Sequence, residues 1–254
     1  MDNLPLIIHI PHSSTRVPQE VRKEILLDDN GLKAELLKMT DHFIYELAET
    51  AENYGHVIRF QYSRLVVDPE RFRDDNQEVM ASVGMGAVYT STSDGKALRV
   101  VSKKDRENLL RNYYDPYHQL IEETTEQLLN TSGKCLIVDL HSFPSKPLPF
   151  ELNQTIDRPH ICIGSDSYHT PDGLVRLSKE YFAGQKLSVE ENLPFSGTLV
   201  PIKFYRRYKA VQSIMIEINR SLYMNEITGE KLSQFNQIQR LVSEYIKCVS
   251  EFTV

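Results

Sequence analysis

Two histidines and a glutamate stand at or near the ends of short apolar runs in this sequence. His12 and His141 each follow such a run, and Glu217 lies near the end of a third. Runs of this kind predict buried strands of a mixed or parallel sheet. The carboxyl ends of such strands meet at one edge of the sheet, where α/β proteins bind ligands. These three side chains could therefore form the site of a metal-dependent hydrolase.

His12 and His141 are the leading candidates for metal ligands, because imidazole suits zinc. The two also stand in matching positions, each after a predicted strand and each followed by serine. The alternative for either residue is a hydrogen-bonded histidine of the core or of a turn. A catalytic zinc usually has three protein ligands and an open position. Asp41 is our first choice for the third ligand, with His42 as a competitor. An aspartate in a first helical turn is also favoured by the helix dipole alone.

Glu217 is the candidate general base. A carboxylate inside an apolar run is costly to bury unless it has a partner or a chemical role. Beside a metal-activated water it could accept a proton and pass it to a leaving nitrogen. The alternative is a buried ion pair with Arg220. Asp139, two residues before His141 on the same side of the strand, is a candidate outer partner of the site.

Arginines near these positions could bind a substrate carboxylate or stabilise an oxyanion, because guanidinium groups pair with such oxygens bidentately. We expect Arg64 or Arg220 to face the oxyanion or a substrate carboxylate, and Arg71 to contribute to binding. Taken singly, each could equally be a surface arginine. Four further residues are candidates for substrate binding: His118, Tyr117, Ser196 and Gly197. For His118 and Tyr117 the alternative is packing in the core.

The composition narrows the class of protein. A net charge of -6 and a pI near 5.8 argue against a nucleic-acid binder. No segment has the roughly 18 apolar residues of a membrane span, and no secretory signal is evident, so we expect a cytoplasmic protein. The three cysteines are far apart, which suits buried thiols in a reducing compartment. We expect a small-molecule substrate, with no nucleic-acid or membrane partner, and leave homo-oligomerisation open.

Apolar runs alternate with helical patterns along the whole chain, which predicts one α/β domain over residues 1–254. Candidate strands are residues 6–10, 56–60, 65–67, 136–140, 161–163, 187–189 and 213–218. Candidate helices are residues 18–27, 41–53 with Thr40 as N-cap, 103–130, 172–182 and 231–252. Two long segments, 73–96 and 142–159, are expected to be loops that cover a site.

Taken together, these motifs resemble the N-formylglutamate amidohydrolases over about residues 6–223. Each motif is weak alone, but their order and spacing are fairly specific. The resemblance rests on Pro11-His12-Ser13 with Pro18, Thr40-Asp41, Ser63-Arg64-Leu65-Val66-Val67-Asp68, Pro116-Tyr117-His118, Asp139-Leu140-His141-Ser142, Pro194-Phe195-Ser196-Gly197 and Glu217-Ile218-Asn219-Arg220-Ser221-Leu222-Tyr223.

The resemblance implies a zinc carboxypeptidase-like fold, a three-layer α/β/α sandwich around a mixed, mostly parallel sheet. It also implies one zinc per chain and hydrolysis of an N-formyl or similar amide. His12 and His141 match the metal-site histidines of the family, and Glu217 matches the general base. Asp41 as a ligand is a less secure match.

One departure from the family pattern concerns the substrate. After Arg64 that pattern runs Asp, any residue, Asn, Arg, whereas this chain has Asp68-Pro69-Glu70-Arg71. Glu70 places a negative charge beside Arg71, which would repel a substrate carboxylate or partly neutralise the arginine. We therefore expect N-formylglutamate not to be the best substrate.

The leading hypothesis is a zinc-dependent amidohydrolase acting on a small N-acyl amino acid. A second hypothesis keeps the site and replaces the substrate with a peptide or cell-wall amide. A closed pocket under the loop 73–96 would favour the small molecule. A third is a non-catalytic metal-binding or sensing protein, which predicts that one of His12, His141 and Glu217 points away from the others.

Overall fold

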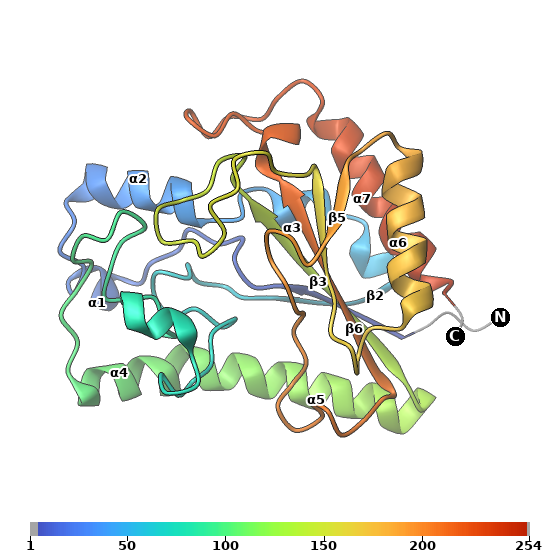
Figure 1. Cartoon of the computed structure of the whole chain (residues 1–254). Coiled ribbons are helices and arrows are strands. Elements are labelled where there is room, and N and C mark those ends of the chain that lie inside the picture. The colour runs from blue at the N-terminus through green and yellow to red at the C-terminus, as the bar shows by residue number, and fades with distance from the viewer. Residues whose placement is uncertain (1–4, 253–254) are drawn as a thin grey trace.

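A six-stranded mixed sheet forms the centre of the computed structural model, which describes residues 5–252 (Figure 1). The strand order is β2-β1-β3-β6-β4-β5. The strands are β1 (Leu6–Ile10), β2 (Gly55–Arg59), β3 (Cys135–Phe143), β4 (Ile161–Gly164), β5 (Val189–Glu191) and β6 (Val211–Asn219). The first four strands in this order, β2, β1, β3 and β6, run parallel to one another. Strand β4 pairs antiparallel with β6 and parallel with β5. The expected mixed, mostly parallel sheet is confirmed.

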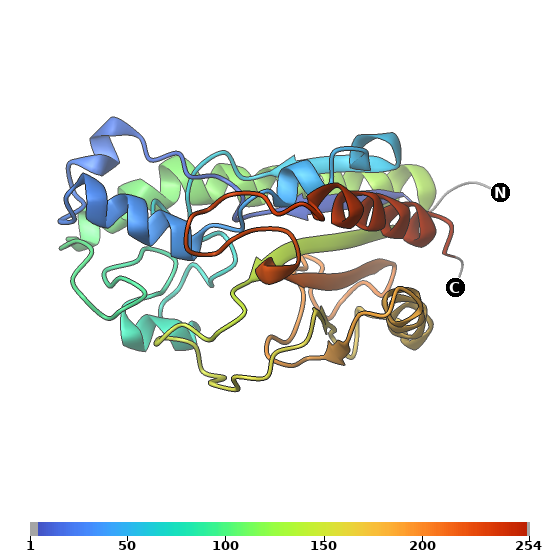
Figure 2. The same ribbon diagram turned by 90° about the horizontal axis from the view of Figure 1, so that it is seen from above.

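Helices cover both faces of this sheet, which confirms the three-layer architecture (Figures 1 and 2). The helices are α1 (Gln19–Arg22), α2 (Asp29–Met39), α3 (Ile44–Leu47), α4 (Lys103–Leu109), α5 (Asp115–Ser132), α6 (Asp172–Gly184) and α7 (Phe235–Ser250). Side chains of α3, α6 and α7 pack on one face, and those of α4 and α5 pack on the other. Alternate residues of β1 and β3 enter the two cores, as the two-residue period of a strand requires.

The longest helical prediction, residues 103–130, is one rod interrupted by a π-helical turn. That turn, Leu110–Tyr114, joins α4 to α5. No helix in the described part of the chain has the length and apolar character needed to cross a membrane. Cys135, Cys162 and Cys248 are free thiols, and the first two are fully buried in strands, as expected.

The helix predicted over residues 41–53 is wrong. The preceding segment forms α2 instead, capped by Asp28, whose side chain accepts the N–H of Gly31 at 2.7 Å. Thr40 ends this helix rather than beginning the next one. Phe43 adopts a left-handed φ of 66°, which interrupts any helix, so only α3 and a 3₁₀ turn at Ala51–Asn53 follow.

The strand predicted at residues 65–67 is also wrong, because this run turns. The N–H of Val66 donates to the carbonyl of Ser63 at 2.9 Å, and that of Leu65 donates to the Ser63 hydroxyl. Its apolar side chains are fully buried without a sheet partner. The run shows that burial alone produces the pattern that was interpreted as a strand.

Candidate metal centre and catalytic site

Strand register places His141 directly beside Glu217. The two residues are cross-strand partners in the parallel β3–β6 pair, and both are buried. We expected His141 to follow its strand, but β3 and β6 pair over nine residues each and carry both side chains inside the sheet. An imidazole and a carboxylate that are far apart in the sequence are thus fixed next to each other.

His12 and Asp41 reach the same place from outside the sheet. His12 lies just beyond the end of β1, and Asp41 follows the C-terminal end of α2. The backbone N–H of Asp41 donates to the carbonyl of His12 at 2.9 Å, which fixes the two segments to each other. The helix that the sequence analysis missed is therefore the element that delivers Asp41.

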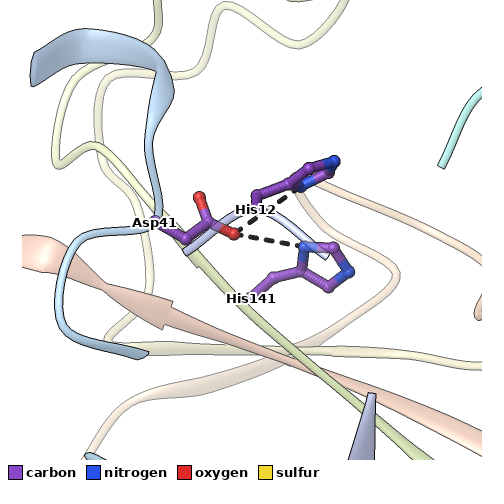
Figure 3. Close-up of side chains that lie close together, drawn as sticks. All are labelled: His12, Asp41 and His141. Atoms are coloured by element: carbon purple, nitrogen blue, oxygen red, sulfur yellow. Dashed lines mark hydrogen bonds and ion pairs between the residues drawn. The ribbon is translucent and has the colours of Figure 1, made fainter. Parts of the chain in front are cut away.

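The side chains of His12, Asp41 and His141 converge in the structure (Figure 3). Oδ2 of Asp41 lies 3.7 Å from Nδ1 of His12 and 3.2 Å from Nδ1 of His141. The imidazole ring centres are 5.0 Å apart. One ligand atom from each residue lies within 4.8 Å of the other two. The three residues chosen as metal ligands are brought together, whereas His42 does not belong to this group.

The Nδ1 atoms of the two histidines, which face Asp41, indicate that this place suits a metal ion. Nδ1 of His12 is buried and has no hydrogen-bond partner. The Nε2 atoms point to carboxylates instead, His12 to Asp68 at 2.8 Å and His141 to Asp139 at 2.9 Å. Metal-ligating histidines usually use their second nitrogen in this way. The donor set of two imidazoles and a carboxylate fits a divalent ion such as zinc.

The carboxylate behind His12 is itself held in place. Asp68 accepts hydrogen bonds from Nη2 of Arg64 at 2.7 Å and from the hydroxyl of Tyr89. Asp68 is fully buried, and the nearby Arg64 and His12 outweigh that burial and hold the pKa of Asp68 well below its usual value. Asp68 is therefore ionised and orients His12. The sequence analysis named Asp68 within a family motif but assigned it no function at the site.

Arg220 occupies the opposite side of the ligand group. Its guanidinium donates to Oδ1 of Asp41 at 2.9 Å, to the Ser142 hydroxyl at 3.1 Å and to the carbonyl of Lys38 at 2.6 Å. The Arg220 side chain is 5% exposed. Its donors are thus engaged by the protein, and they position Asp41.

Negative charge dominates the centre of the site. Burial alone would lower the pKa of His141, but Asp139, Asp41 and Glu217 raise it well above its usual value. For Asp41, burial opposes ionisation, yet His12, His141 and Arg220 hold its pKa well below the usual range. A field that stabilises a protonated imidazole also stabilises a bound cation, which is consistent with a metal centre.

Glu217 is the carboxylate of this group without a full set of partners. Its Oε2 atom is buried and makes no hydrogen bond. Burial is the main reason why the pKa of Glu217 rises to about 8. The ion pair with Arg220 that was the alternative role is absent from the salt bridges of the described residues, because Arg220 pairs with Asp41. A buried carboxyl with a raised pKa suits proton transfer.

A second group of potential ligands lies behind His141. His9 and Asp139 are cross-strand partners, and Nδ1 of His9 lies 2.7 Å from Oδ1 of Asp139 and 3.4 Å from Oε1 of Glu70. Burial raises the pKa of Glu70 to about 7. Sequence reasoning missed His9, although a histidine within a five-residue apolar run needs a buried partner.

A cavity of about 370 Å³ opens onto these residues. Its lining includes His12, His141, Glu217 and Arg71, together with Asp41, Arg64, Glu70, Arg220 and Ser196. Residues of the two long loops, among them Val79 and Leu152, form much of the remaining wall. The expectation that these loops cover the site is confirmed.

Three residues predicted to bind substrate do not line this cavity. His118 is stacked on Tyr114 and its Nε2 contacts the carbonyl of Pro69 at 2.9 Å. Tyr117, a residue of α5, packs in the core with its hydroxyl 3.4 Å from the carbonyl of Ile58. Gly197 has a φ of 86° and forms the turn beyond Ser196. For His118 and Tyr117, the core-packing alternative describes their surroundings.

The fold and this site define a class of protein. It is an α/β protein with two histidines, an aspartate and a buried glutamate around one cavity, a set of side chains that could hold a metal ion and transfer a proton. The family model described as N-formylglutamate amidohydrolase matches residues 4–224. The chain belongs to this family, and it is an amidohydrolase.

Individual relatives agree with this assignment. The chain is 28% identical to an N-formylglutamate deformylase of Pseudomonas aeruginosa over 231 residues, which cover 88% of this chain and 83% of the relative. An N-formylglutamate deformylase of Pseudomonas putida is 26% identical with the same coverage. The crystal structure of N-formylglutamate amidohydrolase from Ralstonia eutropha JMP134 has the same fold, with a TM-score of 0.85 at 22% identity over 99% of this chain and 94% of that one.

Proposed function

We propose that this protein is a zinc-dependent hydrolase that cleaves the amide bond of a small N-formyl amino acid. The observation that carries this proposal is the convergence of His12, Asp41 and His141 in the cavity that also contains the unpaired Glu217. The similarity to N-formylglutamate deformylases supports the amide of an N-formyl amino acid as the scissile bond.

His12, Asp41 and His141 would hold the metal ion, with Asp68 and Asp139 fixing the histidine rings from behind. Such an ion, when bound, polarises a carbonyl group and lowers the pKa of water. The proposal includes one zinc per chain, held by this group. A second group that could hold an ion, His9, Glu70 and Asp139, lies behind His141, so the metal content has to be measured.

Glu217 acts as the proton shuttle. Its carboxylate accepts a proton from the attacking water, and the resulting carboxylic acid donates that proton to the leaving amine nitrogen. Formate and the free amino acid are the products. Burial raises the pKa of Glu217 to about 8, which makes its carboxylate a stronger base toward water. Because this pKa lies near neutral pH, the carboxylic acid can still donate the proton to the more basic amine nitrogen.

The arginines divide into distinct roles. Arg220 positions Asp41, because each nitrogen of its guanidinium donates to the protein. Arg64 lines the cavity and is the candidate that faces the oxyanion. Arg71 lines the same cavity and is the candidate for the substrate carboxylate.

The geometry disfavours the two alternatives. A cavity walled by the loops 73–96 and 142–159 suits a small molecule better than a peptide or cell-wall polymer. The non-catalytic hypothesis predicts that one of His12, His141 and Glu217 points away, whereas all three line one cavity.

The test is metal analysis of the purified protein followed by assays of formate release from N-formyl amino acids. We expect one zinc per chain, loss of activity with a chelator and recovery on adding zinc. Hydrolysis that persists in metal-free protein would contradict the role of the metal. No hydrolysis of any N-formyl amino acid by zinc-loaded protein would contradict the proposed reaction.

A further inference from the structure

Most of the positively charged side chains around the cavity already form ion pairs within the protein. Four cationic side chains line it, and three of them contact a carboxylate of the chain at 2.7–2.9 Å. These pairs are Lys38 with Asp94, Arg64 with Asp68, and Arg220 with Asp41. The buried Asp68 and Asp41 neutralise Arg64 and Arg220, and Lys38 is directed toward Asp94 at the surface.

Arg71 is the exception among these lining cations. Its nearest carboxylates are Asp68 at 3.7 Å and Glu78 at 3.8 Å, both beyond hydrogen-bond distance. Its Nε atom is buried and has no hydrogen-bond partner. One guanidinium of this kind can bind one carboxylate in bidentate fashion. The cavity thus has cationic recognition for a single carboxylate.

A second substrate carboxylate would meet acidic groups. Glu70, Glu78 and Glu151 all line the cavity. Glu78 accepts backbone N–H groups and Glu151 pairs with Arg158, but Oε1 of Glu70 is buried without any hydrogen-bond partner. A dicarboxylate would therefore leave one of its charges without a free cation, which disfavours binding.

The outer wall of the cavity carries several apolar side chains beside these acidic ones. Met80 and Val79 come from one loop, and Leu148, Phe150 and Leu152 come from the other. Val79 is 68% exposed and Leu152 is 78% exposed, so two large apolar side chains of different loops face water at the same cavity. Covering them with an apolar group of a ligand would remove this surface from water, which is favourable.

We infer that the preferred substrate is an N-formyl amino acid with one carboxylate and an apolar side chain, as in formyl derivatives of leucine or methionine. Arg71 binds the carboxylate, and the wall formed by Val79 and Leu152 covers the side chain. This inference rests on the proposed function. It deepens that function by naming the side-chain class that the outer cavity selects.

A substrate panel separates the two parts of the inference. Zinc-loaded protein is assayed for kcat/KM with N-formylleucine, N-formylglutamine and N-formylglutamate. Leucine against glutamine measures the apolar contribution, and glutamine against glutamate measures the charge at constant shape. We expect N-formylleucine to exceed N-formylglutamate by about tenfold or more, the scale on which one or two pocket contacts discriminate. Equal or better turnover of N-formylglutamate would overturn the inference.

A pair of matched variants locates the effect. Leu152→Arg adds a cation to the cavity wall, while Ile156→Arg adds the same charge to the same loop outside the cavity lining. Ile156 is 75% exposed, so its exposure closely matches that of Leu152. We expect Leu152→Arg to shift the ratio of kcat/KM toward N-formylglutamate by about two- to fivefold, as for an exposed charge pair. Ile156→Arg should leave the ratio unchanged, and equal shifts in both would overturn the assignment of Leu152.

Binding without turnover distinguishes failure of the inference from failure of the proposed function. Calorimetry of the Glu217→Gln variant with N-formylleucine and N-formylglutamate reports recognition alone. Tighter binding of N-formylleucine supports the inference even if wild-type protein hydrolyses neither compound, a result that would contradict only the proposed reaction. Tighter binding of N-formylglutamate would overturn the inference while leaving the reaction intact.

Discussion

The two ends of the cavity are built in opposite ways. At the inner end His12, Asp41 and His141 are between 1% and 4% exposed, and each is held by strands or by buried carboxylates and arginines. At the outer end Val79 and Leu152 extend from loops and are mostly exposed. Chemistry needs fixed geometry, which the sheet supplies, whereas selection among substrates depends on loop side chains. Substitutions at the two ends should therefore have different consequences.

The largest effect is expected at the inner end, from Glu217→Gln. The amide is nearly isosteric but cannot accept the proton, so kcat should fall by about 10²–10⁴-fold. Metal content and melting temperature should remain close to wild type, because Oε2 of Glu217 makes no hydrogen bond. Near-normal turnover at full metal occupancy would show that Glu217 is structural.

The next effect tests the carboxylates behind the ligands. Asp68→Asn weakens the hold on Nε2 of His12, and zinc affinity or activity should fall by about 10–100-fold. Asp29→Asn is the control, because Asp29 pairs with Arg22 at the surface with its side chain 96% exposed. Unchanged zinc affinity in a folded Asp68→Asn protein would mean that His12 needs no outer partner.

A smaller effect is expected where the two ends meet, at Glu70. Glu70→Asn removes a largely buried carboxyl without a hydrogen-bond partner on Oε1. The KM for N-formylglutamate should fall about fivefold to tenfold, because a partly desolvated charge costs a kcal/mol or more. N-formylglutamine serves as the neutral control substrate and should change little. If wild-type protein already prefers N-formylglutamate widely and the variant is unchanged, Glu70 lies outside recognition.

The smallest effect on catalysis is expected from His118→Gln, since His118 lies outside the cavity lining. Burial lowers the pKa of His118 from 6.5 to about 4. Between these values the unfolded chain binds the proton and the folded chain does not, so the free energy of unfolding decreases as pH falls from 6.5 toward 4. The loss should be about 1–3 kcal/mol.

Denaturant melts at several pH values check this prediction. Wild-type protein should lose stability over that pH range, and His118→Gln should show a flatter profile, with kcat/KM at neutral pH nearly unchanged. Identical pH profiles for both proteins would contradict the assignment of the shift to His118.

Several features could be predicted from the sequence because they depend on local pattern. The apolar runs before His12, before His141 and around Glu217 identified three central strands and the edge of the sheet where the ligands meet. The two long loops, residues 73–96 and 142–159, were recognised by their composition. These features can be recognised in the sequence, because strand burial and turn formation depend on residues that are neighbours in the chain.

Other features depended on contacts between distant segments. Residues 65–67 have the composition of a strand yet turn, because their side chains are buried without a sheet partner. Leu65 packs with α2 and the loops, and Val66 and Val67 join the core that α4 and α5 cover. Asp41 was expected to begin a helix, but Phe43 interrupts it and the Asp41 backbone bonds to His12. Propensity is a weak prior that such tertiary contacts override.

The sequence by itself determined which residue types stand at or near the strand ends, and hence predicted a hydrolase of α/β architecture with a possible metal site. Only the tertiary structure decided their partners. Parallel register set His141 beside Glu217 and His9 beside Asp139. Buried carboxylates pair with Arg64 and Arg220, whereas Arg71 has carboxylates only at 3.7 and 3.8 Å, beyond hydrogen-bond distance. Register and pairing are properties of segments far apart in the chain, so no local pattern specifies them.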